Sequence, residues 1–102
     1  MLSHALVVKI IAKADRSEEV DQFLSAALPL AQAETFTPVW FAFRANATTF
    51  YIVDAFSSAD NRQKHLEGEI AAALMSQASE QQAKQPSIEP VDEIASKLPM
   101  SV

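Results

Sequence analysis

The residues of this sequence best suited to chemistry are one aspartate and one histidine that lie close together along the chain. Asp54 interrupts an apolar stretch, and at alternating spacing it shares a strand face with Phe50, Ile52 and Phe56. A carboxylate among apolar neighbours is poorly hydrated, which raises its pKa and suits it to act as a general base. The alternative is a carboxylate near a strand end that reaches solvent or pairs with an arginine or a backbone amide.

The histidine follows on the next predicted helix, in the step Lys64-His65-Leu66. Leu66 and Ile70 are spaced to face inward, which places His65 at the margin of the buried stripe. A histidine there can titrate near neutral pH and serve as acid, base or hydrogen-bond donor to a ligand. It could equally be a packed side chain bonded to a backbone carbonyl. Because only a strand end and a helix separate it from Asp54, we predict these two residues as the catalytic pair.

Three aromatic residues and one arginine form the predicted substrate-binding set. Trp40, Tyr51 and Phe56 could line an apolar pocket between a sheet and its helices. Aromatic residues in such segments are also common in cores and in subunit interfaces. Arg62, on the same predicted helix as the histidine, completes the set.

Several kinds of site are excluded by what the sequence lacks. It has no cysteine, which excludes disulfides, thiolate nucleophiles and zinc–thiolate sites. Its two histidines, His4 and His65, do not have the spacing of a metal-binding motif. The single glycine, Gly68, cannot form the glycine-rich loops that hold nucleotide phosphates. We therefore predict no metal and no cofactor.

The composition is that of one globular domain. The chain has 102 residues, of which 49% are hydrophobic and 21% are charged. A net charge of −5, with basic residues that are scattered, argues against a nucleic-acid partner. No apolar run approaches the ~20 residues that cross a membrane, and residues 1–5 do not resemble the start of a signal peptide. We expect a single cytoplasmic domain over residues 1–102, with a short tail at 95–102.

Four segments are predicted to be strands, and three helical stretches are expected between them. The strand candidates are residues 4–13, 39–44, 49–56 and 88–94, and Pro90 indicates that the last lies at a sheet edge.

The first helical stripe covers residues 20–31, and Pro29 should kink or end it. A second helix follows a serine cap and runs to about residue 67, where Gly68 suits a helix end. A third covers residues 69–84.

The resulting order is β-α-β-β-α-α-β. A short turn at Asn46, a residue type that tolerates left-handed backbone, makes the second and third strands an antiparallel hairpin. The order matches a ferredoxin-like split βαβ unit whose second helix is broken in two. We therefore predict an α+β fold with a four-stranded antiparallel sheet and its helices on one face.

The strands are apolar on both faces, whereas a sheet with one wet face should alternate apolar and polar residues. The helices of so short a chain can cover only one face. We therefore predict a homodimer through the open sheet face, in which two sheets form a dimeric α+β barrel.

The chain resembles the antibiotic biosynthesis monooxygenase family, a branch of the dimeric α+β barrel proteins, over most of residues 6–94. The resemblance lies in residues 7–13 before an acidic helix, and in residues 51–56 followed by residues 62–66. In the family, a strand ending acidic-x-aromatic runs into a helix with an Ala-His-Leu-like step, and Phe56 falls where the family often has Trp. The family includes cofactor-independent quinol monooxygenases, haem-degrading oxygenases and proteins without known activity.

Two departures from the family pattern bear on function. Members with oxygenase chemistry often have an Asn on the first strand, where this chain has Val7 or Val8. Haem degraders carry an axial His on the third helix, and residues 70–77 contain none. Haem binding is therefore not expected.

Two functions are compatible with these residues. In the first, the protein is an enzyme: His65 orients or deprotonates a phenolic hydroxyl of a small aromatic ligand, and Asp54 supports His65. Phe56 shapes the wall of the pocket, and the phenolate reacts with dioxygen. The alternative is a non-catalytic dimeric protein that binds or senses a small molecule. The aspartate–histidine pair favours the enzyme, and the apolar first strand favours the binding protein.

Overall fold

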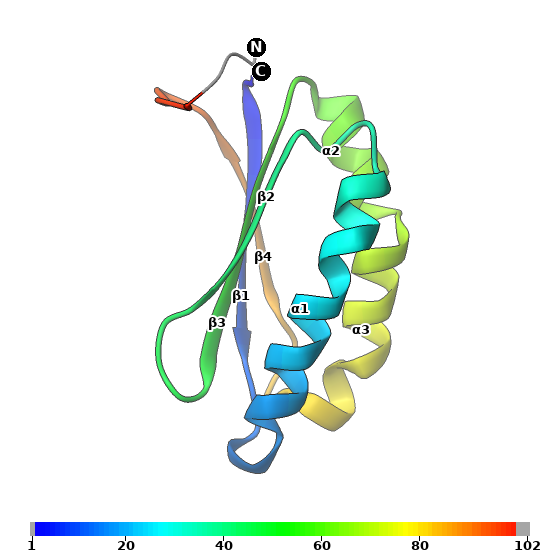
Figure 1. The fold of residues 1–102 in the computed structure, drawn as a ribbon, viewed down its shortest axis with the longest axis vertical. Coiled ribbons are helices and arrows are strands. Elements are labelled where there is room, and N and C mark those ends of the chain that lie inside the picture. The colour runs from blue at the N-terminus through cyan, green and yellow to red at the C-terminus, as the bar shows by residue number, and fades with distance from the viewer. Residues whose placement is uncertain (1, 100–102) are drawn as a thin grey trace.

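The computed structural model describes residues 2–99 and confirms the expected order of elements (Figure 1). Met1 and residues 100–102, the end of the predicted tail, lie outside the described residues. The elements are β1 (His4–Ile11), a 3-10 helix (Ala14–Arg16), α1 (Ser17–Ala33), β2 (Val39–Arg44), β3 (Thr49–Phe56), α2 (Ala59–Leu66), α3 (Glu69–Gln81) and β4 (Ser87–Asp92). The ferredoxin-like α+β fold is confirmed, and the predicted ends of the elements differ from the observed ones by a few residues.

The four strands form one antiparallel sheet in the order β2-β3-β1-β4. The helices all lie on the same side of this sheet, as Figure 1 shows. β4 is an edge strand, as Pro90 predicted, because a proline has no N–H to donate to a second neighbour. Since β2 and β3 are antiparallel neighbours, Val39 at the start of β2 lies opposite Ala55 near the end of β3.

The covered face of the sheet forms the hydrophobic core. Every second residue of β3 is buried on this face, beginning with Phe50 and Ile52 and ending with Asp54 and Phe56. Helix side chains complete the core, among them Val20, Leu24, Ile70 and Leu74. Burying such side chains stabilises the fold by about 25 cal/mol per Å² of apolar surface. Asp54 is a charged residue at one of these core positions.

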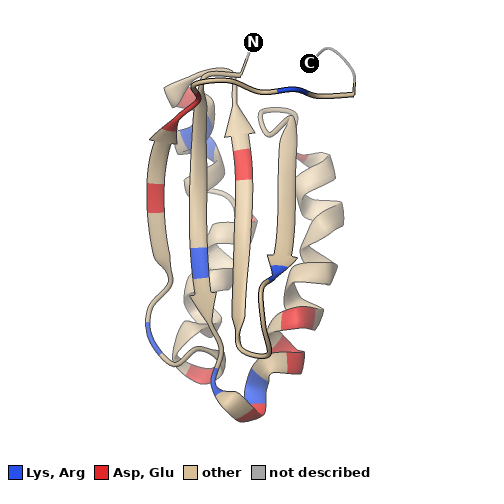
Figure 2. Cartoon of the chain, turned by 90° about the vertical axis from the view of Figure 1, so that its left-hand side faces the viewer, with Lys and Arg blue, Asp and Glu red and all other residues tan. Residues whose placement is uncertain are grey.

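No helix of the described residues covers the other face of the sheet, as Figure 2 shows. Apolar side chains of β1, β2 and β3 gather on this face beside Lys9. Cross-strand neighbours on this face join Val7, Val53 and Phe41 in one row, and Tyr51 and Phe43 in the next. Phe41 and Phe43 are 48% and 50% exposed and stack with their ring centroids 5.5 Å apart. The sheet therefore has the two apolar faces that the strand patterns predicted.

Asn46 turns the hairpin between β2 and β3, but not by adopting a left-handed backbone. No residue between 2 and 99 has a positive φ. The side-chain Oδ1 of Asn46 instead accepts hydrogen bonds from the backbone N–H groups of Thr48 and Thr49, each at 3.0 Å. The expected position of the turn is thus confirmed, and its cause is a side-chain hydrogen bond.

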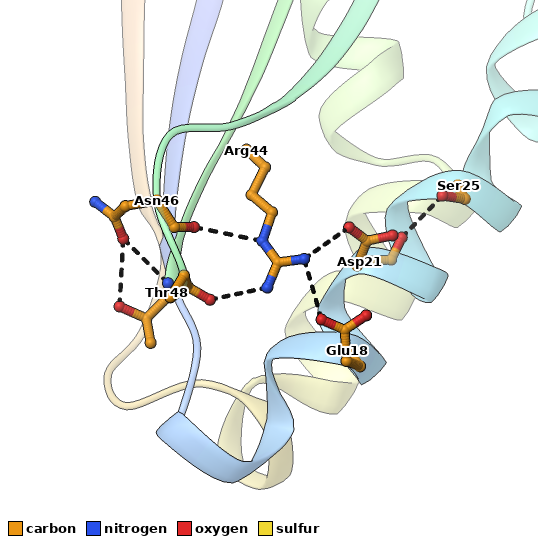
Figure 3. A network of polar contacts seen from close by, with 7 residues as sticks. Glu18, Asp21, Ser25, Arg44, Asn46 and Thr48 are labelled. Atoms are coloured by element: carbon orange, nitrogen blue, oxygen red, sulfur yellow. Dashed lines mark hydrogen bonds and ion pairs between the residues drawn. The ribbon is translucent and has the colours of Figure 1, made fainter.

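An arginine at the end of β2 ties this hairpin to α1 (Figure 3). Arg44 Nη1 donates to Glu18 Oε1 at 3.1 Å and to Asp21 Oδ2 at 3.2 Å. Its other nitrogens donate to the carbonyl oxygens of Asn46 and Ala47. The network holds the N-terminal end of α1 against the sheet.

The helices begin and end for local reasons. α1 continues past Pro29 to Ala33, so this proline does not end the helix. Ser58 caps α2, since its Oγ accepts a hydrogen bond from the N–H of Asn61 at 3.1 Å. No helix within residues 2–99 has the length and apolar character needed to cross a membrane.

Candidate functional site

Asp54 and His65 meet in the core at the end of the sheet where β3 leads into α2. His65 Nε2 lies 2.9 Å from Asp54 Oδ2, and the two side chains are 6% and 0% exposed. His65 is therefore buried, rather than at the margin of the buried stripe as expected. The sequence predicted two residues that are in contact, and their catalytic role stays a prediction.

A second carboxylate, which the sequence analysis did not identify, completes the cluster. Glu34 directly follows α1, and its Oε1 lies 2.7 Å from His65 Nδ1. Thr37, in the connection to β2, donates its hydroxyl to the same oxygen at 2.7 Å. The Glu34 side chain is only 11% exposed. The imidazole of His65 therefore lies between two carboxylates, one at each ring nitrogen.

Strand pairing explains how the chain brings Glu34 to this place. Trp40 lies opposite Asp54 in the β2–β3 ladder, so the residues just before β2 lie next to the end of β3 and the start of α2. A hairpin of β2 and β3 necessarily brings residues 34–38, which precede β2, beside this strand–helix step, so the predicted hairpin held a signal that the sequence analysis did not use. The composition of the connector alone did not distinguish Glu34 from an ordinary surface glutamate.

Burial and charge shift the pKa of both partners in the central contact. Burial raises the pKa of Asp54, the contact with His65 opposes this rise, and the charge of Glu34 adds to it. Burial lowers the pKa of His65, but its close contacts and charge interactions with Asp54 and Glu34 outweigh burial and raise it above the usual value. The raised pKa of His65 favours its protonated form, whereas the raised pKa of Asp54 makes this carboxylate easier to protonate than one in water.

The contact between Asp54 and His65 is close but poorly aligned. Within residues 2–99, no donor makes a well-directed hydrogen bond to either carboxylate oxygen of Asp54. The pair is therefore held by charge at 2.9 Å. A buried carboxylate that lacks aligned donors is costly, and such groups are concentrated at functional sites.

A small cavity lies directly beside Asp54 and His65. Its volume is about 30 Å³, which accommodates a group about the size of one water molecule. Its other walls are apolar and are formed by Leu6, Val8, Ile52, Leu66, Ile70, Ala71, Leu74 and Ile88. Among these, Leu66, Ala71 and Ile88 are partly exposed, so the mouth of the cavity lies between the α2–α3 corner and β4.

Two of the predicted substrate-binding residues, Phe56 and Trp40, lie near the cluster, but neither lines the cavity. The Phe56 ring lies 5.3 Å from the His65 ring, centroid to centroid, at a tilt of 42°. Trp40 is the cross-strand neighbour of Asp54, and its ring packs on a cluster of small and apolar helix residues. Phe56 therefore supports the imidazole from outside the cavity.

The other two lie elsewhere. Tyr51 is on the open face of the sheet, away from the helices. Arg62 Nη1 lies 3.4 Å from the carbonyl oxygen of Ala5 and 3.3 Å from that of Val91, where it joins α2 to β1 and β4. The structure thus brings neither residue to the cavity.

The single glycine of the chain provides space for the cluster. A Cβ atom at Gly68 would lie 2.9 Å from Glu34 Oε2 and 3.2 Å from the carbonyl oxygen of His65. Gly68 caps the start of α3 with a φ of −86°, which any residue can adopt. The glycine is therefore explained by the close approach of Glu34 and not by a left-handed helix end.

A larger groove of about 460 Å³ lies between α1 and the β2 edge, lined by residues that include Leu28, Trp40, Phe43 and Arg44. It contains neither Asp54 nor His65, so the smaller cavity is the candidate site. Among residues 2–99, no group of three or more His, Cys, Asp or Glu side chains is arranged to hold a metal ion.

No family model matches the chain, and no curated protein matches it. The chain is, however, similar to several solved structures. The NE2512 protein of unknown function from Nitrosomonas europaea is 44% identical, with a TM-score of 0.95 over 99% of this chain and 98% of that one.

More distant structures share the fold. A putative antibiotic biosynthesis monooxygenase from Nitrosomonas europaea has a TM-score of 0.79 at 12% identity, over 90% of each chain. Another, from Caulobacter crescentus, has a TM-score of 0.76 at 16% identity, over 92% of each chain. At such identities the similarity establishes the fold.

Proposed function

The chain belongs to the same family as NE2512 and has the ferredoxin-like fold of the antibiotic biosynthesis monooxygenases, and on this basis we propose that it is a cofactor-independent monooxygenase. The proposed substrate is a small aromatic molecule with a hydroquinone-type hydroxyl. The observation that most supports this function is the buried contact of Asp54 with His65 beside an otherwise apolar cavity.

The proposed first step is the transfer of a phenolic proton to Asp54. Both ring nitrogens of His65 face carboxylates, so His65, although it lines the cavity, has no nitrogen free to take the proton. The oxygens of Asp54 are buried and lack aligned donors, and Asp54 lines the cavity, so a hydroxyl group that enters it would supply the missing donor. Burial raises the pKa of Asp54, which makes it a stronger base than a carboxylate in water.

The phenolate is electron-rich and can then react with dioxygen. One hydroquinone and one dioxygen give one hydroxyquinone and one water molecule. The substrate supplies all four electrons that reduce dioxygen, so the reaction balances without an added reductant. The apolar walls around Asp54 would exclude bulk water from the phenolate.

The size of the cavity limits how the substrate can bind. About 30 Å³ accommodates a hydroxyl group but not an aromatic ring. We place the hydroxyl against Asp54 and the ring at the mouth, in contact with Leu66, Ala71 and Ile88. This arrangement requires the side chains at the mouth to move apart.

Oxygen uptake with a panel of hydroquinones tests this function. The wild-type protein should consume one dioxygen per hydroquinone above the rate without protein. Asp54→Asn should lower the rate by about 100-fold or more, the usual contribution of a general base. Asp92→Asn, which changes an exposed carboxylate at the end of β4, should leave the rate unchanged. Full activity in Asp54→Asn would exclude the proposed base.

The cavity holds little more than a hydroxyl group, which also favours a second function: the protein binds a small molecule without converting it. A panel member that binds with an affinity dependent on Asp54, but that is never oxidised, would support this alternative against the enzyme. Isothermal titration under anaerobic conditions, followed by oxygen uptake with the same compound, separates the two.

We further propose that the functional form is a homodimer joined through the open sheet face. Phe41 and Phe43 expose half of their area on this face and lie beside Tyr51, Val53 and Val7. Contiguous apolar patches of this kind on a small protein mark interaction surfaces. A second copy would cover this face with an equally apolar surface.

A further inference from the structure

Glu34 differs from Asp54 in its position relative to the cavity. Asp54 lines the cavity, whereas Glu34 does not and lies at the opposite nitrogen of His65. Glu34 therefore cannot touch a ligand in the cavity, although it is bound to the residue that supports the base. A role for Glu34 must act through His65.

We infer that Glu34 is a positioning residue for the proposed reaction: it holds His65 Nδ1, keeps the imidazole protonated and directs Nε2 at Asp54. This inference depends on the proposed function for its catalytic part only. The link between the charge of Glu34 and the protonation of His65 depends on geometry alone.

The chain holds the Glu34 carboxylate with contacts from three segments. His65 Nδ1 lies 2.7 Å from Oε1, and the Thr37 hydroxyl donates to the same oxygen at 2.7 Å. Gly68 leaves the space that Oε2 occupies, since a Cβ there would lie 2.9 Å from this oxygen. A glutamate that only ended a helix would need none of these contacts.

Two carboxylates supply the charge around His65. β3 contributes Asp54, and the end of α1 contributes Glu34, and these two carboxylates are the charges that act on His65 within residues 2–99. Other charged residues near the cluster in sequence are exposed or engaged elsewhere, namely Arg62 on backbone carbonyls, and Lys64, Glu67 and Glu69 in solvent.

Removing the charge of Glu34 should therefore weaken the base by way of His65. Glu34 raises the pKa of His65, so its loss should lower that pKa and leave a less charged imidazole beside Asp54. Asp54 would then lose the cation that holds its own pKa down, and more of it would be protonated at a given pH. Substrate binding at the mouth of the cavity would not change.

The test compares Glu34→Gln with the wild type. Glutamine keeps an oxygen for Thr37 and His65 but removes the charge. We expect the NMR titration of His65 to move to lower pH. The acid limb of the pH–rate profile should move to higher pH, because Asp54 loses its imidazolium neighbour, and kcat at pH 7 should fall about tenfold with KM within twofold. The only other histidine is His4, so a His4→Gln protein assigns the signals.

Two further variants control the experiment. Glu69→Gln removes an exposed carboxylate at the start of α3 and should change neither the titration nor the rate. Glu34→Asp keeps the charge and should restore part of the wild-type titration. If Glu34→Gln does not fold, Gly68→Ala displaces the carboxylate instead and should lower the His65 titration in the same direction.

The outcomes separate this inference from the proposed function. A folded Glu34→Gln protein in which His65 titrates as in the wild type would overturn the inference. If no hydroquinone is oxidised by the wild type, the proposed function fails, and the titration still decides whether Glu34 controls the charge of His65.

Discussion

Buried charge is the central feature at the scale of single residues. Asp54, His65 and Glu34 come from three elements and are nearly inaccessible to solvent. Breaking a buried ion pair by removing one partner is strongly destabilising, because it leaves an uncompensated charge in the core. The cluster therefore links stability to pH, and the direction follows from the pKa shifts.

The wild-type protein should lose stability as the pH rises above about 6.5, the ordinary pKa of histidine. The folded-state pKa of His65 is raised, so its stabilising contribution is complete below that value and is lost as pH rises through the folded-state pKa. The raised pKa of Asp54 acts in the same direction at lower pH. Urea unfolding at pH 6 and pH 9 measures the loss.

His65→Gln should lower the free energy of unfolding by about 3 kcal/mol at pH 6, since two buried carboxylates lose their cation. The difference from the wild type should shrink at pH 9, where the wild-type imidazole is also neutral. It should shrink near pH 4 too, where the carboxylates of the variant can take up protons. A difference that is constant with pH would show that His65 is not charged in the folded protein.

Two of the three residues of this cluster could be predicted from the sequence. Sequence reasoning found Asp54 because a carboxylate among alternating apolar residues is unusual, and His65 because it follows on the next helix. It did not find Glu34, whose role depends on how the connection before β2 lies against α2. That placement is a tertiary contact across 31 positions of the chain, which no local pattern encodes.

At the scale of elements, the α2–α3 junction is shaped by the cluster. Gly68 separates the two helices and leaves room for the Glu34 carboxylate. The sequence predicted the break between the helices and a helix end at Gly68, and Gly68 directly follows the last turn of α2. Its φ of −86° shows that the requirement is steric.

Gly68→Ala should destabilise the protein by about 1 kcal/mol, although its backbone conformation suits alanine. The new Cβ would displace Glu34 Oε2. In a Glu34→Ala background the space is free, so the same substitution should be neutral or stabilising, because alanine restricts the unfolded chain. Equal effects in both backgrounds would show that the two residues do not interact.

The hairpin network of Figure 3 makes a smaller contribution. Arg44 lies with its guanidinium 5.0 Å from the Phe50 ring centroid and pairs with two carboxylates that are 77% and 42% exposed. Exposed ion pairs typically contribute about 0–1 kcal/mol and are screened by salt.

Arg44→Met keeps the apolar contact and should cost less than about 1 kcal/mol at low salt, and less still in 1 M NaCl. Arg16→Met, which removes a single exposed pair with Glu19, serves as the matched control and should cost less than Arg44→Met. Thermal unfolding at the two salt concentrations measures both. A loss that does not depend on salt would assign the effect of Arg44 to packing.

At the scale of the whole molecule, the apolar sheet is the feature that the sequence predicted best. The same strands that bury one face against the helices expose Phe41, Phe43 and Tyr51 on the other. Period-two alternation reveals which residues share a face, so both faces could be assigned before the strands were paired. The partner for the open face is a property of two chains and stays a proposal.

The dimer proposal predicts a mass of about twice 11.1 kDa by light scattering at micromolar concentration. Val53→Lys places a charge at the centre of the open face and should yield a folded species of one chain mass. Ala72→Lys, on the exposed side of α3, should remain a dimer. A wild-type protein that is monomeric and stable at these concentrations would contradict the proposed dimer.

The roles proposed for Asp54 and Glu34 require His65 to carry a proton on both ring nitrogens, which face these two side chains. The ¹⁵N chemical shifts of the His65 imidazole at pH 7, without any ligand, report this state directly. We predict two protonated ring nitrogens. A neutral ring with one bare nitrogen would contradict the charge assignment on which the proposed base, and the role of Glu34, depend.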